Sequence, residues 1–143
     1  MYQMFGAKFV LPNGEEIPGA GVVDLYTEAG NDRLIGNVVI ESEFGELVGF
    51  ENHSGRTYLV ESLQPLGRVK AGYGNNASDG VEGVIDRNIF GTYMHGPALA
   101  KNPALADELI RRALILRGEN VELAPLDDTL EHKAAEVAAT RPQ

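Results

Sequence analysis

The stretch IFGTYMHGP at residues 89–97 decides how this chain of 143 residues is expected to fold. Its first five residues favour a β-strand, and the glycine and proline at its end stop that strand before a predicted helix. His95 therefore lies at the C-terminal edge of a sheet, where open α/β proteins gather their functional groups. Because histidine exchanges protons near neutral pH, His95 is a candidate catalytic base. Position alone is also compatible with a structural histidine whose ring is held by hydrogen bonds, so the assignment depends on the rest of the chain.

Residues 22–93 are predicted to be β-structure with tight turns. Runs of apolar and β-branched residues predict strands at 22–26, 33–41, 47–50, 57–60, 67–70, 81–85 and 89–93. Glycine, asparagine and other polar residues predict a loop at 28–32, reversals at 43–46 and 52–55, and a surface loop at 72–80. No helix is predicted between residues 22 and 93, whereas a doubly wound sheet needs helices between its strands. We therefore expect an antiparallel extension of a parallel sheet.

Helices are predicted at both ends of the chain. Residues 2–9 are expected to form a short helix. Near the C-terminus, Asn102 is a good N-cap, and Pro103 fits the first position of a helix that Gly118 ends. A second helix is expected from residue 127 or 128 to about 140, with a capping box at its start and a thin apolar face that makes it peripheral.

Composition limits the function classes. With 43% hydrophobic residues, the chain is long enough for one domain with a core. Its 12 basic and 21 acidic residues give a net charge of −9, which disfavours binding to nucleic acid or to an anionic membrane. No apolar run approaches the length of a membrane span, and the first residues do not form a signal peptide, so a cytoplasmic protein is predicted. The chain has no cysteine, which excludes a disulfide scaffold, a cysteine-based zinc site and thiol chemistry that starts from this chain.

Most catalytic motifs are absent from the sequence. His53, His95 and His132 lack the HxH or HExxH spacing of a metal site, so no metal is expected. No glycine-rich phosphate loop follows a strand, and no GxSxG elbow is present. His53 is interpreted as a turn residue with a hydrogen-bonded ring, and His132 as part of a solvated helix face.

Arg33 is the second candidate for a functional side chain. It lies where a polar loop enters a strand, and its planar guanidinium suits a carboxylate that binds through both oxygens. The alternative interpretation is a surface ion pair with Asp32 or a nearby acid.

Three runs of sequence carry a resemblance to a known family. These are GFENHSGRT at 49–57, GYGNN at 72–76, and GTYMHGP at 91–97 with KNP at 101–103. Together they resemble the class I glutamine amidotransferases of the cobyric-acid-synthase type. The opening YQMFG at 2–6 is similar to the residues that follow the nucleophile elbow of that family. The resemblance covers nearly the whole chain. It implies a flavodoxin-like α/β fold in which residues 1–143 are the C-terminal part of a single amidotransferase domain, with a β-rich middle and two C-terminal helices.

The resemblance also implies a chemistry. In this family a cysteine thiolate attacks the carboxamide of glutamine, and a histidine at the end of a late strand moves the protons. The match assigns that role to His95 and the binding of glutamine to Arg33, in place of the two structural interpretations above.

Two departures from the family pattern are important. The nucleophilic cysteine expected just before Tyr2 is not in this chain, and Pro97 stands where ordinary members carry the glutamate of a His-x-Glu pair. Glu51, Glu61 and Asp79 all remain candidates for an acid that orients the imidazole. We therefore expect the 143 residues alone to lack glutaminase activity, because the thiolate and part of the oxyanion hole are missing. We also expect exposed apolar faces and self-association.

The resemblance implies a place in peptidoglycan biosynthesis. Its nearest branch supplies ammonia from L-glutamine to a MurT-like Mur ligase, which uses ATP and Mg to amidate the D-glutamate of lipid II. No cofactor is expected in this chain. The alternatives are a cobyrinic or cobyric acid amidotransferase domain, and a non-catalytic module that binds glutamine. The run NHSGRT at 52–57 favours the lipid II branch.

Overall fold

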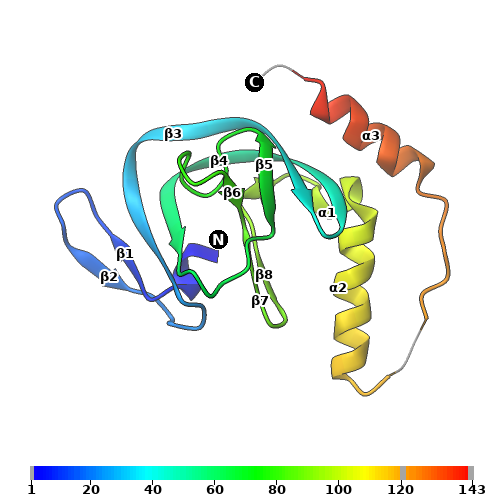
Figure 1. Cartoon of the computed structure of the whole chain (residues 1–143), viewed down its shortest axis with the longest axis horizontal. Coiled ribbons are helices and arrows are strands. Elements are labelled where there is room, and N and C mark those ends of the chain that lie inside the picture. Colours follow the sequence, from blue (N-terminus) through cyan, green and yellow to red (C-terminus); the bar gives the residue numbers. More distant parts are fainter. Residues whose placement is uncertain (1, 120–121, 142–143) are drawn as a thin grey trace.

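The computed structural model describes residues 2–119 and 122–141. Its central feature is a long antiparallel hairpin of β3 (Leu25–Ser42) and β4 (Gly45–Leu59), which curves across the molecule in Figure 1. The register runs from Ser42 opposite Gly45 to Leu25 opposite Leu59, and it shifts once, between Ala29 and Leu34. This hairpin provides the frame on which the candidate site is built.

The other strands extend the hairpin into a seven-stranded sheet of order β2-β1-β3-β4-β9, with β5 paired to β3 and β6 paired to β5. β1 is parallel to β3, and the other pairs of this sheet are antiparallel. β7 and β8 form a separate two-stranded ribbon. The remaining strands are β1 (Lys8–Val10), β2 (Glu16–Pro18), β5 (Gly67–Ala71), β6 (Val81–Glu82), β7 (Val84–Asp86), β8 (Ile89–Gly91) and β9 (Met94–His95).

β4 shows the alternation of a strand that covers a core with one of its faces. Its inward side chains include polar ones, and the buried set is Leu47, Glu51, His53 and Thr57. On the other face Val48 is buried, and the remaining side chains are exposed or partly exposed, among them Glu46, Phe50, Asn52, Ser54 and Arg56. The polar residues at 51–57 are therefore divided between the two faces of one strand.

Two predicted breaks in these strands are wrong. The reversal predicted at 52–55 lies inside β4, and the loop predicted at 28–32 lies inside β3. In β4 the polar residues do not form a turn, because alternate ones face solvent and the inward ones find hydrogen-bond partners. In β3 the extra residues form a bulge, since residues 30–33 lie opposite Ser54 alone.

Other predictions need smaller corrections. The N-terminal helix is a 3-10 helix over Tyr2–Phe5, and residues 8–10 belong to a strand instead. The segments at 81–85 and 89–93 are each interrupted, the first at Gly83 and the second after Gly91. The loop at 72–80 has no helix or strand, as predicted, but Asn75 and Asn76 are buried in it.

The hydrophobic core consists of two clusters. One cluster packs under the middle of the hairpin and comprises Val38, Ile40, Leu47, Leu66, Ile85, Met94 and Leu105. The other lies toward the N-terminus and comprises Tyr2, Val23, Leu25, Val84 and Tyr93. Met94 belongs to the first cluster and Tyr93 to the second, so the two residues that precede His95 are packed in the core.

The helices follow the sheet in the chain and flank it in Figure 1. α1 (Ala98–Lys101) is followed by α2 (Pro103–Leu116), which begins at the predicted proline. α3 (Thr129–Ala139) has no buried side chain and is peripheral, as predicted. The expected capping box at Asp128 and Glu131 is not formed, and Asp127 accepts hydrogen bonds from the Thr129 backbone and hydroxyl instead.

Asn102 has a different role from the predicted helix cap. Its side chain makes no cap hydrogen bond, although the residue is buried. The amide donates to the carbonyls of Val48 and Ala98, and its oxygen accepts from the Val48 N–H. Asn102 therefore fastens the α1–α2 junction to β4.

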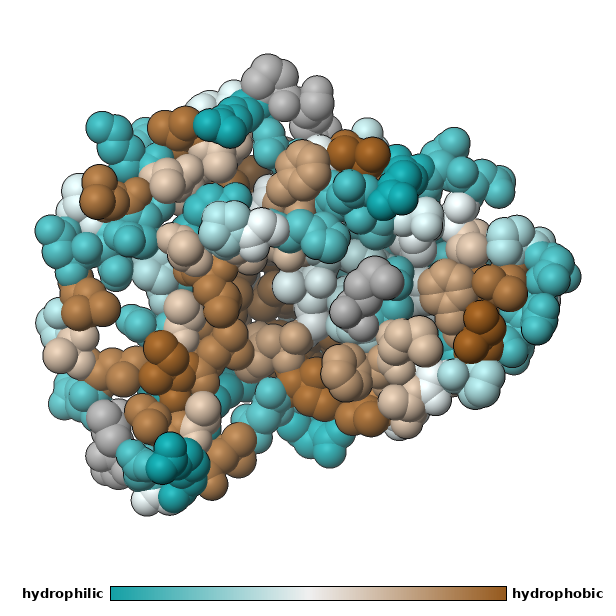
Figure 2. Space-filling view, turned by 180° about the vertical axis from the view of Figure 1, so that it is seen from behind, coloured by the Kyte–Doolittle hydropathy of each residue, from teal (hydrophilic) through white to brown (hydrophobic). Residues whose placement is uncertain are grey.

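Many apolar side chains lie at the surface, as expected from the sequence. The exposed set includes Phe50 on the sheet and Ile110, Leu116, Leu130 and Val137 on the helices. Figure 2 shows brown apolar side chains running from the side of the helices across the middle of this face. Self-association through such surfaces stays a prediction. In the described ranges, no helix is long and apolar enough to cross a lipid bilayer.

The Asn102 clamp gives a first testable prediction. Asn102→Ala leaves the N–H and C=O of Val48 without partners, so we expect the free energy of unfolding to fall by about 1–3 kcal/mol. The matched control Asn88→Ala changes an exposed asparagine and should stay within about 0.5 kcal/mol of the parent chain. Urea unfolding measures both variants. Equal stability of the two variants would contradict the role of Asn102.

Candidate functional site

The bulge in β3 places Arg33 beside the end of a cavity. Gly30 allows the bulge to lie close to β4, since a Cβ at this position would meet the Ser54 carbonyl at 2.7 Å. The Arg33 guanidinium donates from Nε and Nη2 to the Asn52 side-chain oxygen, at 2.9 and 2.7 Å. The surface ion pair with Asp32 or a nearby acid, which was the alternative interpretation, is not formed by Arg33 within the described residues.

The cavity beside Arg33 has a volume of about 450 Å³. Its polar wall comes from β3, β4 and the N-terminal 3-10 helix, and consists of Arg33, Asn52, His53, Ser54 and Gln3. Its apolar wall comes mainly from β1 and the residues around β2, with Phe9, Leu11 and Ile17. The cavity thus has a cation at one end and apolar side chains along one side. Such a cavity suits a small zwitterionic or acidic molecule with an aliphatic portion.

The register of β9 brings His95 onto the same face as Arg33. His95 lies opposite Phe50, and Asn52 follows two residues later on β4. Facing and alternate residues share one side of a sheet, and two residues of a strand span about 7 Å. His95 is exposed, and its imidazole has no hydrogen-bond or ion-pair partner in residues 2–119 and 122–141. His95 therefore shares the open face of β4 with Asn52, the partner of Arg33, but it is not one of the residues that line the cavity.

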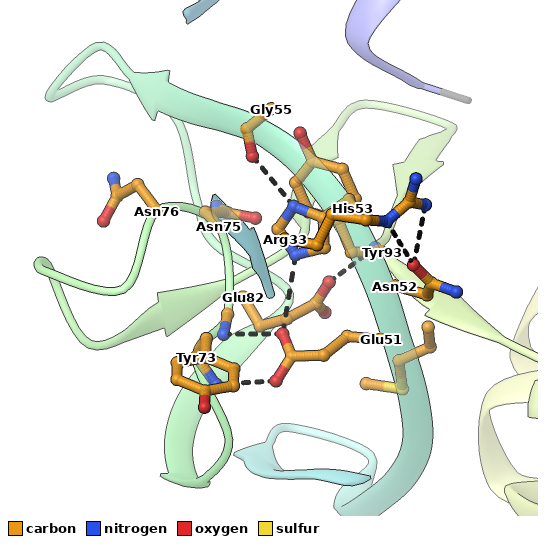
Figure 3. A network of polar contacts seen from close by, with 12 residues as sticks. Arg33, Glu51, Asn52, His53, Gly55, Tyr73, Asn75, Asn76, Glu82 and Tyr93 are labelled. Atoms are coloured by element: carbon orange, nitrogen blue, oxygen red, sulfur yellow. Dashed lines mark hydrogen bonds and ion pairs between the residues drawn. The ribbon is translucent and has the colours of Figure 1, made fainter. Parts of the chain in front are cut away.

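A buried carboxylate and a buried histidine lie behind this face. His53 Nδ1 is 2.8 Å from the Gly55 carbonyl oxygen, which can only accept, so this nitrogen carries a proton. His53 Nε2 lies 3.5 Å from Glu51 Oε2 and has no hydrogen bond. Glu51 accepts the N–H groups of Tyr73 and Gly74, at 2.6 and 3.0 Å (Figure 3). A carboxylate oxygen and an imidazole nitrogen therefore face each other in the interior at 3.5 Å.

Tyr93 connects this buried pair to the strand of His95. Its ring stacks on the His53 ring with centroids 3.5 Å apart and planes within 7°. Its hydroxyl bonds with Gln3 Nε2 at 2.6 Å and Thr57 Oγ1 at 2.7 Å. Gly55 leaves room for these contacts, since a Cβ there would lie 2.1 Å from Gln3 Nε2. Burial raises the pKa of Tyr93, so this phenol stays protonated at neutral pH.

Glu82 holds the backbone just before His95. It is fully buried, and it accepts the Tyr93 N–H at 2.6 Å and the Thr92 hydroxyl at 3.0 Å. The Thr92 oxygen in turn accepts the Met94 N–H at 3.0 Å. Burial raises the pKa of Glu82 from 4.5 to about 7, and the hydrogen bonds from Tyr93 and Thr92 oppose part of this rise. These contacts explain why the predicted strand at 89–93 is interrupted.

None of the three candidate acids forms a hydrogen bond or an ion pair with His95 within the described ranges. Glu51 turns to the opposite face and meets His53. Asp79 accepts from Asn76 and from the Val81 N–H, and Glu61 is exposed. No group of three or more His, Cys, Asp or Glu side chains in the described part of the chain is placed to hold a metal ion.

Sequence reasoning missed the buried pair. His53 was interpreted as a turn residue, which is wrong: it lies in β4 and is 4% exposed. Its ring is hydrogen-bonded, as predicted. The available signal was the alternation of Glu51, His53 and Thr57 in one continuous strand, which the turn-like residues between them concealed. His132 is exposed on α3, as predicted.

Comparison of the sequence with known protein families shows that residues 1–103 match the CobB/CobQ-like glutamine amidotransferase domain. The chain belongs to this family. The mixed sheet with flanking helices agrees with the α/β class and the amidotransferase fold expected from the sequence. The match also includes both Arg33 and His95.

Curated relatives refine the comparison. The chain is 45% identical to the lipid II isoglutaminyl synthase (glutamine-hydrolyzing) subunit GatD of Staphylococcus aureus, over 98% of this chain and 57% of the relative. It is 42% identical to the subunit of the same name from Streptococcus pneumoniae, over 94% of this chain and 54% of the relative. It is 29% identical to a cobyric acid synthase of Sphingopyxis alaskensis, over 96% of this chain and 28% of the relative. The chain thus spans a little over half the length of the GatD relatives.

The raised pKa of Glu82 predicts a dependence of stability on pH. A folded-state pKa of about 7 lies above the unfolded value of 4.5, so the folded chain binds this proton more tightly. The resulting stability is present below pH 4.5 and is lost as the pH rises through 7, at a cost of about 3 kcal/mol. Glu82→Gln has no proton to lose. Its unfolding free energy should therefore rise relative to the parent chain by up to that amount between pH 4.5 and 8.

Urea unfolding at several pH values tests this prediction. The control Glu61→Gln changes an exposed carboxyl and should follow the parent chain at every pH. A Glu82→Gln variant that also follows the parent chain would show that Glu82 does not retain its proton on folding.

Proposed function

We propose that this chain forms the histidine and glutamine-binding part of a glutaminase site. The observation that carries the proposal is that His95 and the Arg33–Asn52 contact share one face of the sheet. His95 on β9 lies opposite Phe50 of β4, and Asn52, which lines the cavity with Arg33, is two residues further along β4. In this proposal, residues 1–143 are the C-terminal part of a single amidotransferase domain. The family match supports the reaction class.

The proposed chemistry divides between binding and proton transfer. Arg33 binds the α-carboxylate of L-glutamine through its planar guanidinium, and Asn52 holds the guanidinium in place. His95 accepts the proton of a cysteine thiol, and the thiolate attacks the carboxamide carbon. The C–N bond then breaks, and the departing ammonia takes the proton from the imidazolium. Water hydrolyses the thioester to glutamate. The thiol comes from outside these 143 residues, which contain no cysteine.

We further propose that the ammonia is used in peptidoglycan biosynthesis. A MurT-like Mur ligase partner would amidate the D-glutamate of lipid II with ATP and Mg, in the cytoplasm. Two relatives at 42–45% identity support this assignment, since both are named as subunits of a lipid II isoglutaminyl synthase. The second candidate is an amidotransferase domain for cobyric acid, which relatives at 29–34% identity support less strongly. The third is a binding module without turnover.

The isolated chain should not release ammonia from L-glutamine, because no thiolate is available to attack the substrate. A coupled ammonia assay on the purified chain, with glutamine-free and enzyme-free controls, measures this directly. Glutamine-dependent ammonia release by the pure chain would contradict the proposed mechanism.

A chimera tests the positive part of the proposal. This chain would replace the matching 57% of the Staphylococcus aureus relative, which supplies the remaining residues. We expect the folded chimera to hydrolyse glutamine, His95→Gln to lower kcat by at least about 100-fold, and Arg33→Ala mainly to raise KM. The control His132→Gln changes an exposed histidine on α3 and should leave both constants unchanged. Full activity in the His95→Gln chimera would overturn the assignment.

A further inference from the structure

A groove lies between α1 and α3, on the other side of His95 from the Arg33 cavity. His95 faces Phe50 of β4. In one direction along β4, Asn52 contacts Arg33; in the other direction, Val48 contacts Asn102 at the α1–α2 junction. The groove has a volume of about 620 Å³, and Pro97, two residues after His95, forms part of its wall. The α3 side is fixed to the sheet by the Asn37 side chain, which donates to the Arg141 carbonyl at 3.1 Å.

Three cations surround this groove without a compensating acid. Lys101, Lys133 and Arg141 line it, and none of them forms an ion pair within the described ranges. No carboxylate belongs to its described wall. Burial, and next the charge of Arg141, lowers the pKa of Lys101. A quarter of the 12 basic residues of a chain with net charge −9 therefore gather here unpaired.

The floor of the groove is apolar. Leu130 is 76% exposed and Val137 is 47% exposed, and both face the space between the helices. A small inorganic anion would leave these side chains in water, whereas an amphipathic segment would cover them and pair with the cations at the rim. The mixed chemistry therefore indicates a peptide rather than a free anion.

We propose that the groove between α1 and α3 binds an acidic, amphipathic segment of a partner protein. Charges further apart than a Debye length of about 8–10 Å are largely screened, so a narrow segment in the groove interacts mainly with the three local cations. An extended anionic membrane would also meet the net charge of −9 and be repelled. The partner is the subunit that consumes ammonia, which places its docking segment beside His95. This last identification rests on the proposed function, and the binding surface itself does not.

The test uses a synthetic helical peptide with leucine at positions i, i+3, i+4 and i+7 and glutamate elsewhere. Fluorescence anisotropy should show saturable binding of one peptide per chain. The variant Lys101→Gln/Lys133→Gln/Arg141→Gln should bind at least about tenfold more weakly, because it loses three ion pairs. A peptide of the same pattern with glutamine for glutamate should also bind at least about tenfold more weakly.

A matched control separates local pairing from overall charge. The variant Arg68→Gln/Lys70→Gln/Arg117→Gln removes three exposed cations elsewhere, so both variants change the net charge from −9 to −12. The control should retain binding within about twofold, and circular dichroism should show that both variants are folded. Equal losses in the two variants, or equal binding of the two peptides, would overturn the proposal.

Two further outcomes are decisive. Binding of phosphatidylglycerol vesicles but not of the peptide would overturn the proposal in favour of a membrane surface. Peptide binding together with an inactive chimera would retain the docking groove and reject only the glutaminase assignment and the identity of the partner.

Discussion

The antiparallel pairing of β3 with β4 determines where every part of the candidate site lies. Because side chains alternate along a strand, β4 presents Asn52 to the open face and Glu51 and His53 to the interior. The same strand receives β9, which places His95 opposite Phe50 and on the open face. A shift of either pairing by one residue would move His95 or Asn52 to the other side of the sheet. The register therefore links the binding and proton-transfer groups.

The interior behind this face contains several buried polar side chains, and these support one another through hydrogen bonds. Glu51 and His53 are held by backbone groups of the loop at 72–80 and by Gly55, and Glu82 is held by Thr92 and Tyr93. A buried network of this kind contributes little net stability but penalises any arrangement that leaves a member unpaired. We interpret it as the element that fixes the strand of His95, which has few residues and little regular pairing of its own.

The two residues selected from the sequence lie on the open face, whereas the structure of the interior was largely not predicted. His95 and Arg33 could be selected because a strand followed by glycine and proline, and a cation at a strand entry, are local patterns. The continuity of β4 through residues 52–55 could not, since asparagine, serine and glycine favour a turn until cross-strand partners are known. For the same reason Glu51 and His53 were not recognised as a pair, and Asn102 was assigned to a helix cap instead of to Val48. These features depend on contacts between residues far apart in the chain.

The most direct test of this account is the strand register in solution. Nuclear Overhauser contacts between backbone protons of facing residues can be measured on the isotopically labelled chain. We expect contacts between Phe50 and His95 and between Leu34 and His53, with no reversal at residues 52–55. Contacts typical of a turn at 52–55, or a His95 paired with a residue other than Phe50, would separate His95 from Arg33 and contradict the proposed site.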